Sequence, residues 1–241
     1  MPGSSPKSAE NNDFSGIPHV DNWVFDLDNT LYSAETELFK QVSNRITKFV
    51  AVALDLKMVA AERLRRDYFR SHGSTLRGMM TNHATNPEQY LAFVHDIDVS
   101  VIQPNDALDT ALGALSGRKF IFTSANQAHA ERILERLGIR RHFEHLFSIE
   151  NSDYVPKPHR QVYERMIQTC AVEPRRAAMF EDSARNLEPA AALGMVTVWL
   201  PNNTEFSQQG ADGNHIDFVV EDLSAWLNSV GQHRRQALGG G

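Results

Sequence analysis

The sequence of 241 residues lacks a second cysteine, a long apolar run and an excess of positive charge, and each absence excludes a class of protein. Its single cysteine, Cys170, has no partner for an internal disulfide, which fits a reducing compartment. No apolar stretch approaches the roughly 20 residues that span a bilayer, and the first residues (MPGSSPKSAENND) lack the apolar core of a secretory signal. We therefore expect a cytoplasmic protein with no membrane partner.

The charge balance argues against nucleic acid as the main partner. Lys and Arg number 24 and Asp and Glu number 30, which gives a net charge of −6, whereas nucleic-acid-binding proteins carry basic surfaces. A small anionic substrate remains compatible with this balance if its site gathers its own cations.

The length corresponds to one or two domains, and 41% hydrophobic residues are enough for a core. We expect a monomer or a homodimer.

Short apolar runs alternate with helical patterns along most of the chain, which is typical of βαβ units and a parallel sheet. Helical periodicity lies between several of these runs, at Gln127–Leu137, Arg160–Cys170 and Arg185–Leu193. The predicted fold class is therefore α/β. The predicted strands are Trp23–Phe25, Lys119–Phe122, His145–Ile149, Ala177–Phe180, Val196–Leu200 and Ile216–Val220.

The segment that begins at residue 35 departs from this alternation, because it has helical periodicity and no convincing strand. Asn86-Pro87 opens one of its helices as the N-cap and first position. We expect residues 35–103 to form an inserted helical cap between two parts of one core domain, 19–34 and 104–230. Residues 1–18 are rich in Ser, Pro, Asn and Gly and are expected to be a disordered leader, with a loose tail at 231–241.

Polar side chains follow three of the predicted strands, at the edge where open parallel sheets bind ligands. They lie in Asp26-Leu27-Asp28, Thr123-Ser124 and Glu181-Asp182, and Lys157 stands between two prolines in a rigid loop. Taken singly, each has an ordinary role, as a turn residue, a helix N-cap, a surface lysine or a favourable charge at a helix N-terminus. Their shared position at one sheet edge favours a catalytic site.

Phosphoryl transfer is the chemistry that this set of residues fits, because it needs a nucleophile, an acid/base, a metal ion and cations for the phosphate. Asp26 is the candidate nucleophile, and Asp28, on the same side of an extended backbone, is the candidate acid/base. Thr123 and the amide after it would hold phosphate oxygens, and Lys157 would neutralise the clustered carboxylates. Asp182 would complete an all-oxygen site suited to Mg²⁺.

Four segments together carry a family resemblance. DLDNTLY, TSAN, the lysine of the KP dipeptide and FEDSARNL resemble the four motifs of the haloacid dehalogenase-like superfamily. The resemblance extends from residue 22 to about residue 222, nearly the whole chain. It implies a doubly wound, Rossmann-like parallel sheet core, in which the helical insertion is a C1-type cap.

The same resemblance implies metal ligands and a reaction class. Mg²⁺ would be held by the Asp26 carboxylate, the Asp28 backbone carbonyl and the Asp182 carboxylate, with Glu181 nearby as a water-mediated or occasional direct ligand. The dehalogenase members do not carry an Asp two residues after the nucleophile, because a halide leaves without a proton. Asp28 therefore indicates a phosphatase or phosphomutase, with haloacid dehalogenase as the alternative.

The substrate prediction rests on a narrower resemblance. Asn29 and Tyr32 in the first motif, the cap stretch GSTLRGMM and the segment DYVPKP are similar to the pyrimidine 5′-nucleotidase branch. This implies a phosphoric monoester hydrolase that acts on UMP or CMP. Ser124 stands where the branch usually has Asn, so only its backbone amide is carried over to phosphate binding. Phosphoglycolate, a sugar phosphate and pyridoxal phosphate are the alternative substrates.

Base selectivity must come from the cap, because a phosphate site shared by a superfamily cannot choose a nucleobase. The stretch Gly73–Gly78 is bounded by glycines and is expected to hang as a loop towards the sheet edge. Thr75, Arg77 and Asn82 would donate hydrogen bonds to the carbonyl oxygen at position 2 of a pyrimidine. The alternative for Arg77 is an ion pair with a carboxylate at the cap surface.

Two non-enzymatic classes share some of these residues. Phospho-accepting receiver domains also use an Asp, a hydroxyl residue and a Lys, but their acidic pair precedes the acceptor Asp and no large insertion follows it. A catalytically inactive ligand-binding relative would lack part of the catalytic set. Every expected catalytic side chain is present here, which favours an enzyme whose partner is a small phosphorylated metabolite.

Overall fold

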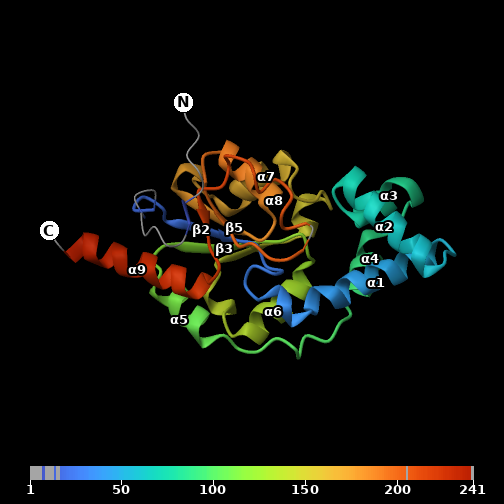
Figure 1. The fold of residues 1–241 in the computed structure, drawn as a ribbon, viewed down its shortest axis with the longest axis horizontal. Coiled ribbons are helices and arrows are strands. Elements are labelled where there is room, and N and C mark those ends of the chain that lie inside the picture. Colours follow the sequence, from blue (N-terminus) through green and yellow to red (C-terminus); the bar gives the residue numbers. More distant parts are fainter. Residues whose placement is uncertain (1–6, 9–13, 15–16, 205, 240–241) are drawn as a thin grey trace.

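A parallel sheet with helices on both faces forms the body of the computed structural model, which describes residues 7–8, 14, 17–204 and 206–239 (Figure 1). Within these ranges the sheet has seven strands in the order β1-β7-β6-β5-β2-β3-β4, and every pair is parallel. The α/β prediction is confirmed, and each of the six predicted strands overlaps an observed one. The strands are β1 (Lys7–Ser8), β2 (Asn22–Phe25), β3 (Arg118–Phe122), β4 (His145–Phe147), β5 (Ala177–Glu181), β6 (Val196–Trp199) and β7 (Phe218–Val219).

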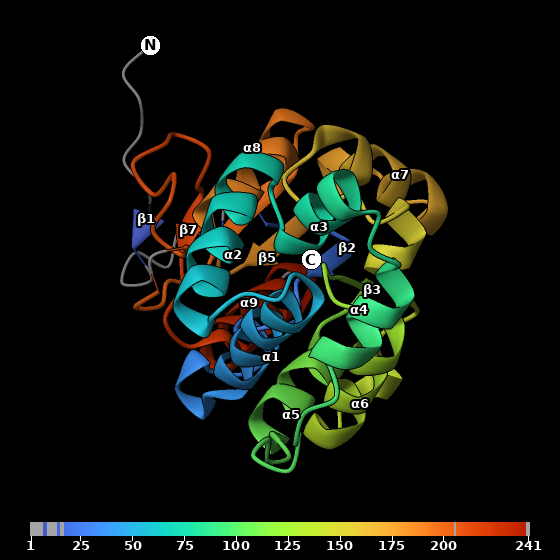
Figure 2. The same cartoon turned by 90° about the vertical axis from the view of Figure 1, so that its right-hand side faces the viewer.

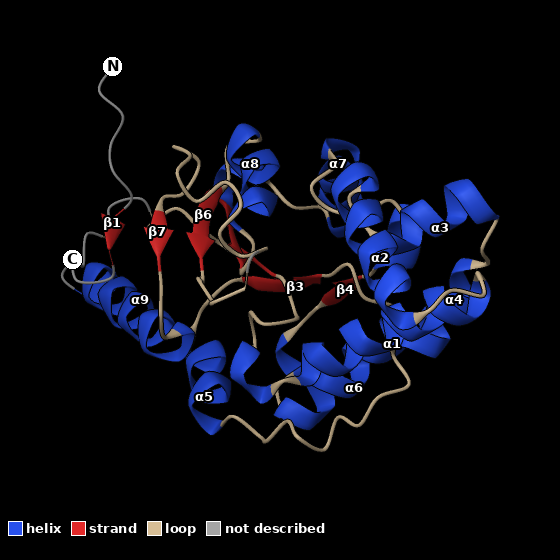
Figure 3. Ribbon diagram, turned by 45° about the vertical axis from the view of Figure 1, so that its right-hand side comes forward, coloured by secondary structure: helices blue, strands red, loops and turns tan. Residues whose placement is uncertain are grey.

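Two groups of helices cover the two faces of this sheet (Figure 3). On one face lie α5 (Asp106–Ala114), α6 (Gln127–Leu137) and α9 (Leu223–Gly239), and on the other α7 (Arg160–Cys170) and α8 (Ala184–Ala192). Alternation along the strands supplies both layers, because successive side chains point to opposite faces. This is the doubly wound arrangement that the resemblance implied. No helix of the described part of the chain is long and apolar enough to cross a membrane.

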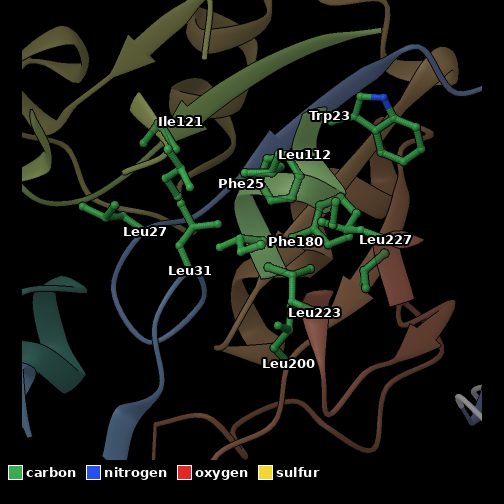
Figure 4. Packing of buried hydrophobic residues seen from close by; sticks show 14 of the residues in the cluster. Trp23, Phe25, Leu27, Leu31, Leu112, Ile121, Phe180, Leu200, Leu223 and Leu227 are labelled. Atoms are coloured by element: carbon green, nitrogen blue, oxygen red, sulfur yellow. The ribbon is translucent and has the colours of Figure 1, made fainter. Parts of the chain in front are cut away.

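Aromatic side chains from neighbouring strands pack against one another in the core under α5, α6 and α9. Phe25 of β2 stacks on Phe180 of β5 with ring centroids 4.4 Å apart and an angle of 11° between the rings. Figure 4 shows this pair among Leu112, Leu223 and Leu227 from the covering helices. Burial of such large apolar side chains contributes about 1.5–3 kcal/mol each to folding, and it fixes the central strands beneath the site.

Four helices, α1 (Leu38–Ala53), α2 (Met58–His72), α3 (Thr75–His83) and α4 (Pro87–Val94), form a separate block with its own buried cluster. Figure 2 looks onto this block, which lies in front of β2, β3 and β5. After α4 the chain rejoins the sheet layers, since Ile97 and Val99 pack against the core and Ile102 is buried in it. The helical block thus lies within the predicted 35–103 segment but ends before its last residues.

Both predicted tails include residues that belong to elements of the fold or to its core. Lys7–Ser8 pairs with β7, and Phe14 and Ile17 are buried in the core, with the ring of Phe14 5.8 Å from that of Trp226. The predicted leader over 1–18 therefore includes two apolar residues that contribute to the core, and Phe14 does so against Trp226 of α9. Residues 1–6, 9–13 and 15–16 of that leader lie outside the described residues.

The carboxyl-terminal tail needs a similar correction. Residues 231–239 of the predicted loose tail belong to helix α9, which ends at Gly239, and residues 240–241 lie outside the described residues. Arg234 accounts for part of this extension, since its guanidinium donates to the carbonyl oxygen of Val20 at 2.7 Å.

Strand order determines where a ligand site can form. From β2 the chain proceeds to β3 and β4 on one side of the sheet, and then to β5, β6 and β7 on the other. Phe25 at the end of β2 is in register with Ile121 of β3 and Phe180 of β5, so these three strands end side by side. The chain direction across the sheet therefore reverses at β2, and ligands of doubly wound sheets bind at such a topological switch point.

Candidate active site

Lys157 forms hydrogen bonds with residues from three parts of the chain at the topological switch point. Its Nζ donates to Asp26 Oδ1 at 2.7 Å, to Glu181 Oε2 at 2.6 Å and to the carbonyl oxygen of Phe122 at 3.0 Å. Its side chain is only 2% exposed. Asp26 is anchored in turn, because its N–H donates to the carbonyl oxygen of Phe180 at 2.9 Å. Sequence reasoning predicted Asp26, Lys157 and Glu181, and the fold brings them together.

The turn after β2 supplies a hydrogen bond to Oδ2, the second oxygen of the Asp26 carboxylate. Asn29 has a left-handed backbone (φ 63°), which asparagine tolerates better than most residues. This turn returns the Thr30 hydroxyl to Asp26 Oδ2, to which it donates at 3.1 Å. Asn29 Nδ2 also donates to Asp182 Oδ2 at 3.4 Å. The hydrogen bonds from Thr30 and Lys157 therefore orient the carboxylate of Asp26, the candidate nucleophile.

Asp28 has partners that sequence reasoning did not assign to it. Its Oδ1 accepts from the Tyr32 hydroxyl at 2.6 Å and pairs with His129 Nε2 at 3.2 Å. Burial raises the pKa of Asp28, but the His129 ring and the two hydrogen bonds outweigh it and hold that pKa below its ordinary value. A phosphate dianion bound beside Asp28 would oppose this lowering, because a nearby negative charge raises the pKa of a carboxyl group.

Three carboxylates crowd the end of β5. Oxygens of Asp26, Glu181 and Asp182 all lie within 4.8 Å of one another. Burial, reinforced by neighbouring carboxylates, raises the pKa of Asp26 to about 7, of Glu181 to about 7 and of Asp182 to about 6. The Lys157 ammonium opposes these shifts but does not cancel them. A hard divalent cation with oxygen ligands would relieve the repulsion, so the residues fit a metal such as Mg²⁺.

Glu181 differs from the other two carboxylates in its hydrogen bonds. Its Oε1 accepts from Asn186 Nδ2 at 3.1 Å and from the Ser183 N–H at 3.3 Å, while its Oε2 accepts from Lys157. Both oxygens are thus already hydrogen-bonded. This arrangement suits a carboxylate that balances the charge of Lys157.

Asn202 is a site residue that the sequence analysis missed. Its Nδ2 donates to Asp182 Oδ2 at 2.8 Å. The backbone of Asp182 is held as well, since its carbonyl oxygen accepts from Trp199 Nε1 at 2.9 Å and from the Ser207 hydroxyl at 2.6 Å. A signal was present, because Asn202 follows the predicted strand Val196–Leu200 at the same sheet edge.

Thr123 and Ser124 lie at the end of β3, as predicted. The Thr123 hydroxyl accepts from the Ala125 N–H at 3.0 Å. The alternative role for Thr123, as a helix N-cap, is wrong, because Asn126 caps α6 through its side-chain oxygen, which accepts from the N–H of His129 at 3.0 Å. Thr123 is buried and Ser124 is exposed, and both line the cavity above the carboxylates.

A cavity of about 610 Å³ opens over these residues, between the sheet edge and the helical block. Its floor includes Asp26, Asp28 and Asp182, and its walls include side chains of α1, α2 and α4. Phe69 of α2 and Phe206 of a core loop both line it, and their rings meet with centroids 4.4 Å apart. The volume lies within the range of roughly 300–1,000 Å³ that small-molecule sites occupy.

The cap residues lie differently from the expectation. Thr75–His83 is helix α3, capped by the Ser74 hydroxyl, which accepts from the N–H of Arg77 at 3.1 Å, so the predicted loop is wrong. Gly73 ends α2 at φ 80° and the next helix begins almost at once. Gly78 serves close packing, because a Cβ there would lie 2.4 Å from Tyr68 Cγ.

Only one of the three predicted base-reading residues lines the cavity. Thr75 does so, but its hydroxyl donates to the carbonyl oxygen of Arg65 at 3.2 Å. Arg77 and Asn82 are not among the described residues that line it. Asn82 Nδ2 instead donates to the carbonyl oxygen of Gly78 at 2.9 Å, within α3.

Sequence comparison finds a family match and a distant curated relative. The haloacid dehalogenase-like hydrolase family matches residues 20–194. Phosphate metabolism protein 8 of Saccharomyces cerevisiae is 25% identical over 189 residues, which cover 72% of this chain. The chain spans 59% of the length of that relative.

Solved structures with the same fold include both phosphatases and dehalogenases. The HAD phosphatase from Thermococcus onnurineus has a TM-score of 0.55 and 19% identity, with 92% of this chain and 99% of that chain covered. CbbY from Rhodobacter sphaeroides in complex with phosphate has a TM-score of 0.59 and 17% identity, with 87% and 99% covered. The L-2-haloacid dehalogenase from Xanthobacter autotrophicus has a TM-score of 0.51 and 14% identity, with 91% and 99% covered. At these identities the likeness shows the fold and does not choose between the reactions.

Proposed function

The chain belongs to the haloacid dehalogenase-like hydrolases, and from this premise we propose that it is a Mg²⁺-dependent phosphatase of a small phosphomonoester. The observation that carries the proposal is Asp28. It stands two residues after Asp26, lines the same cavity and is held by Tyr32 and His129. A departing alkoxide needs a proton donor, whereas a halide does not. A carboxyl group in this position therefore supports phosphatase chemistry over dehalogenation.

Asp26 is the proposed nucleophile in two successive displacements. In the first, an Asp26 oxygen forms a bond to phosphorus while the ester P–O bond breaks, and Asp28 gives a proton to the leaving oxygen. In the second, a water oxygen forms a bond to phosphorus as Asp28 takes its proton, the bond between phosphorus and the Asp26 oxygen breaks, and inorganic phosphate leaves. The hydrogen bonds from Thr30 and Lys157 keep Asp26 aimed during both steps.

The remaining polar residues would bind the phosphoryl group and the metal. Thr123, the Ser124 amide and Lys157 would hold phosphoryl oxygens. The carboxylates of Asp26 and Asp182 and the carbonyl oxygen of Asp28 would hold Mg²⁺, with Glu181 behind them. The bound metal would neutralise the charge that otherwise keeps a phosphate away from a carboxylate. Asn202 and Asn29 would keep Asp182 oriented towards it.

A pyrimidine nucleoside 5′-monophosphate, UMP or CMP, is the proposed substrate, with residues 35–103 acting as the cap. The first motif with Asn29 and Tyr32 supports this branch of the family. Aromatic side chains in the cavity wall, among them Phe69 and Phe206, offer the apolar surface that a planar base needs. The name of the yeast relative, a phosphate metabolism protein, agrees with phosphate release. Phosphatases of phosphoglycolate, sugar phosphates or pyridoxal phosphate remain the alternative.

A substrate panel tests the proposal. Release of inorganic phosphate would be measured from UMP, CMP, AMP, phosphoglycolate, glucose 6-phosphate and pyridoxal phosphate, with Mg²⁺ and with chelator, and ranked by kcat/KM. The Asp26→Asn variant, purified in parallel, controls for contaminating phosphatases. We expect Mg²⁺-dependent release that is highest for UMP and CMP. Another preferred phosphomonoester would refute the nucleotide assignment alone, whereas halide release from 2-chloropropionate without phosphatase activity would refute the reaction class.

A further inference from the structure

Among the described residues, His129 of α6 lies outside the predicted motifs and contacts Asp28, the proposed acid/base group. We infer that His129 is a positioning residue, which fixes Asp28 so that one of its carboxyl oxygens carries the transferred proton. The inference rests on the proposed phosphatase function. Both the Tyr32 hydroxyl and His129 Nε2 are directed at Oδ1 of Asp28, at 2.6 and 3.2 Å, and neither uses Oδ2. An oxygen that already accepts two hydrogen bonds is a poor site for a proton, so Oδ2 is the oxygen that exchanges it.

The environment of the His129 ring supports this assignment. Its side chain is 0% exposed, and its backbone N–H donates to the side-chain oxygen of Asn126 at 3.0 Å, which anchors the residue in the first turn of α6. Among the described residues Nδ1 has no hydrogen-bond partner. Buried polar groups are normally paired, and packing alone would favour an apolar residue at this position. The hydrogen bond with Asp28 explains why a histidine is buried here. A carboxylate partner selects the tautomer with its proton on Nε2.

His95 connects this arrangement to the helical block. It is the first residue after α4, and its ring lies nearly parallel to that of His129, with centroids 4.4 Å apart and an angle of 17°. Its carbonyl oxygen and that of Ile97 accept from the Arg132 guanidinium at 3.1 and 2.8 Å. Arg132 belongs to α6, which also carries His129. The segment that returns from the block is thus tied to the helix that orients Asp28.

The consequence for the reaction concerns proton transfer and not substrate binding. The O–H bond at Oδ2 of Asp28 breaks as the leaving oxygen gains the proton, and Oδ2 later accepts a proton from the attacking water. With His129 replaced, Tyr32 alone holds Oδ1, and the carboxyl group can rotate out of line. A misplacement of about 1 Å can lower a rate by about 10²-fold, so kcat should fall while KM changes little.

Two substitutions separate the hydrogen bond from the packing of the ring. His129→Gln keeps a donor but loses the aromatic ring, and His129→Phe keeps a ring against His95 but loses the donor. On UMP we expect kcat to fall roughly 10–100-fold in His129→Phe, with KM within about threefold, and most of the rate to return in His129→Gln. In the pre-steady-state burst of p-nitrophenolate from p-nitrophenyl phosphate, both variants should resemble the wild type, because this leaving group needs little protonation.

The opposite ranking would overturn the inference. If His129→Phe matched the wild type on UMP while His129→Gln lost activity, the ring would act through packing. Thermal unfolding of both variants, compared with the wild type, identifies a loss caused by misfolding. Nitrogen-15 NMR of the ring gives a readout that does not need turnover: we expect a protonated Nε2 whose signal shifts in Asp28→Asn. An unprotonated Nε2 would refute the positioning role, whereas a wild type inactive on every phosphomonoester would refute the proposed function.

Discussion

Lys157 and Asp26 stand 131 residues apart in the chain and form a buried ion pair, with Nζ 2.7 Å from Oδ1. The same ammonium lies 2.6 Å from Glu181, so one cation serves two carboxylates. Breaking a buried pair by removing one partner leaves an uncompensated charge. The position of Lys157 therefore controls both the charge of the site and the stability of the strands that build it.

Replacing this lysine should destabilise the protein in a pH-dependent way. In Lys157→Met without metal, we expect the free energy of unfolding at pH 8 to fall by about 3–5 kcal/mol. At pH 5 the loss should be smaller, because Asp26 and Glu181 can then take up protons. Urea denaturation at both pH values measures the difference. Lys40→Met, at an exposed ion pair with Glu37, is the control and should change stability by less than about 1 kcal/mol at either pH. An equal loss at both pH values in Lys157→Met would contradict this account.

Asp26→Asn should abolish turnover while the protein stays folded, because an amide does not attack phosphorus. We expect kcat to fall by roughly 10⁴-fold or more, and beryllium fluoride to inhibit the wild type as an analogue of the aspartyl-phosphate. Phosphate release and circular dichroism check the two halves of the prediction. Substantial turnover in Asp26→Asn would exclude a covalent intermediate on this residue.

Asp28 and Asp182 should respond differently to Mg²⁺. Asp28→Asn removes the acid/base carboxyl but keeps the backbone carbonyl, so kcat should fall about 10²–10⁴-fold with little change in the Mg²⁺ concentration that gives half-maximal rate. Asp182→Asn should raise that concentration and regain part of its rate at high Mg²⁺. Titration of the rate with Mg²⁺ compares them. Equal rescue of both variants would show that these roles are assigned wrongly.

The strand-end residues could be predicted because parallel strands end at one sheet edge, so the sequence position of Asp26, Thr123 and Asp182 also determines their place in space. His129 could not be found in this way. It lies within a helix, and its approach to Asp28 depends on how α6 packs on the sheet, which no local pattern encodes. Asn202 could have been predicted, because it follows the predicted strand Val196–Leu200 and so lies at the same sheet edge as the other site residues.

The cap was harder to predict for a physical reason. A glycine can end a helix or allow two helices to pack closely, and the sequence does not distinguish these roles. Gly73 ends a helix, whereas Gly78 packs against Tyr68 of the neighbouring helix. Three of the four helices, α1, α2 and α4, were predictable from their apolar residues or the Asn86-Pro87 start, whereas α3 was predicted as a loop. The direction of each polar side chain depends on how the helices cross. Thr75 therefore reached the cavity, and Arg77 did not.

Stability without metal should fall as the pH rises. The raised pKa values of Asp26, Glu181 and Asp182, about 7, 7 and 6, mean that the native state binds more protons than the unfolded chain between about pH 4 and pH 7. In this window the contribution of these groups to the unfolding free energy decreases with increasing pH. Mg²⁺ should reverse the trend near pH 8, because it binds the deprotonated carboxylates of the native state. Urea titrations with chelator and with Mg²⁺ measure both, and a metal-free stability that rises from pH 5 to pH 8 in wild type but not in Asp182→Asn would contradict the prediction.

Selectivity for the base should depend on α2 more than on α3. Phe69 lines the cavity beside Phe206, whereas Arg77 is not among the described lining residues. We expect Phe69→Ala to lower kcat/KM for UMP by roughly 1–3 kcal/mol, about 5–150-fold, and to change kcat/KM for ribose 5-phosphate much less, because that substrate has no base. Arg77→Ala, the matched control from the neighbouring helix, should affect the two substrates equally. A selective loss for UMP in Arg77→Ala, with none in Phe69→Ala, would return base recognition to the polar residues of α3 and would mean that the cap closes over the substrate in a different arrangement.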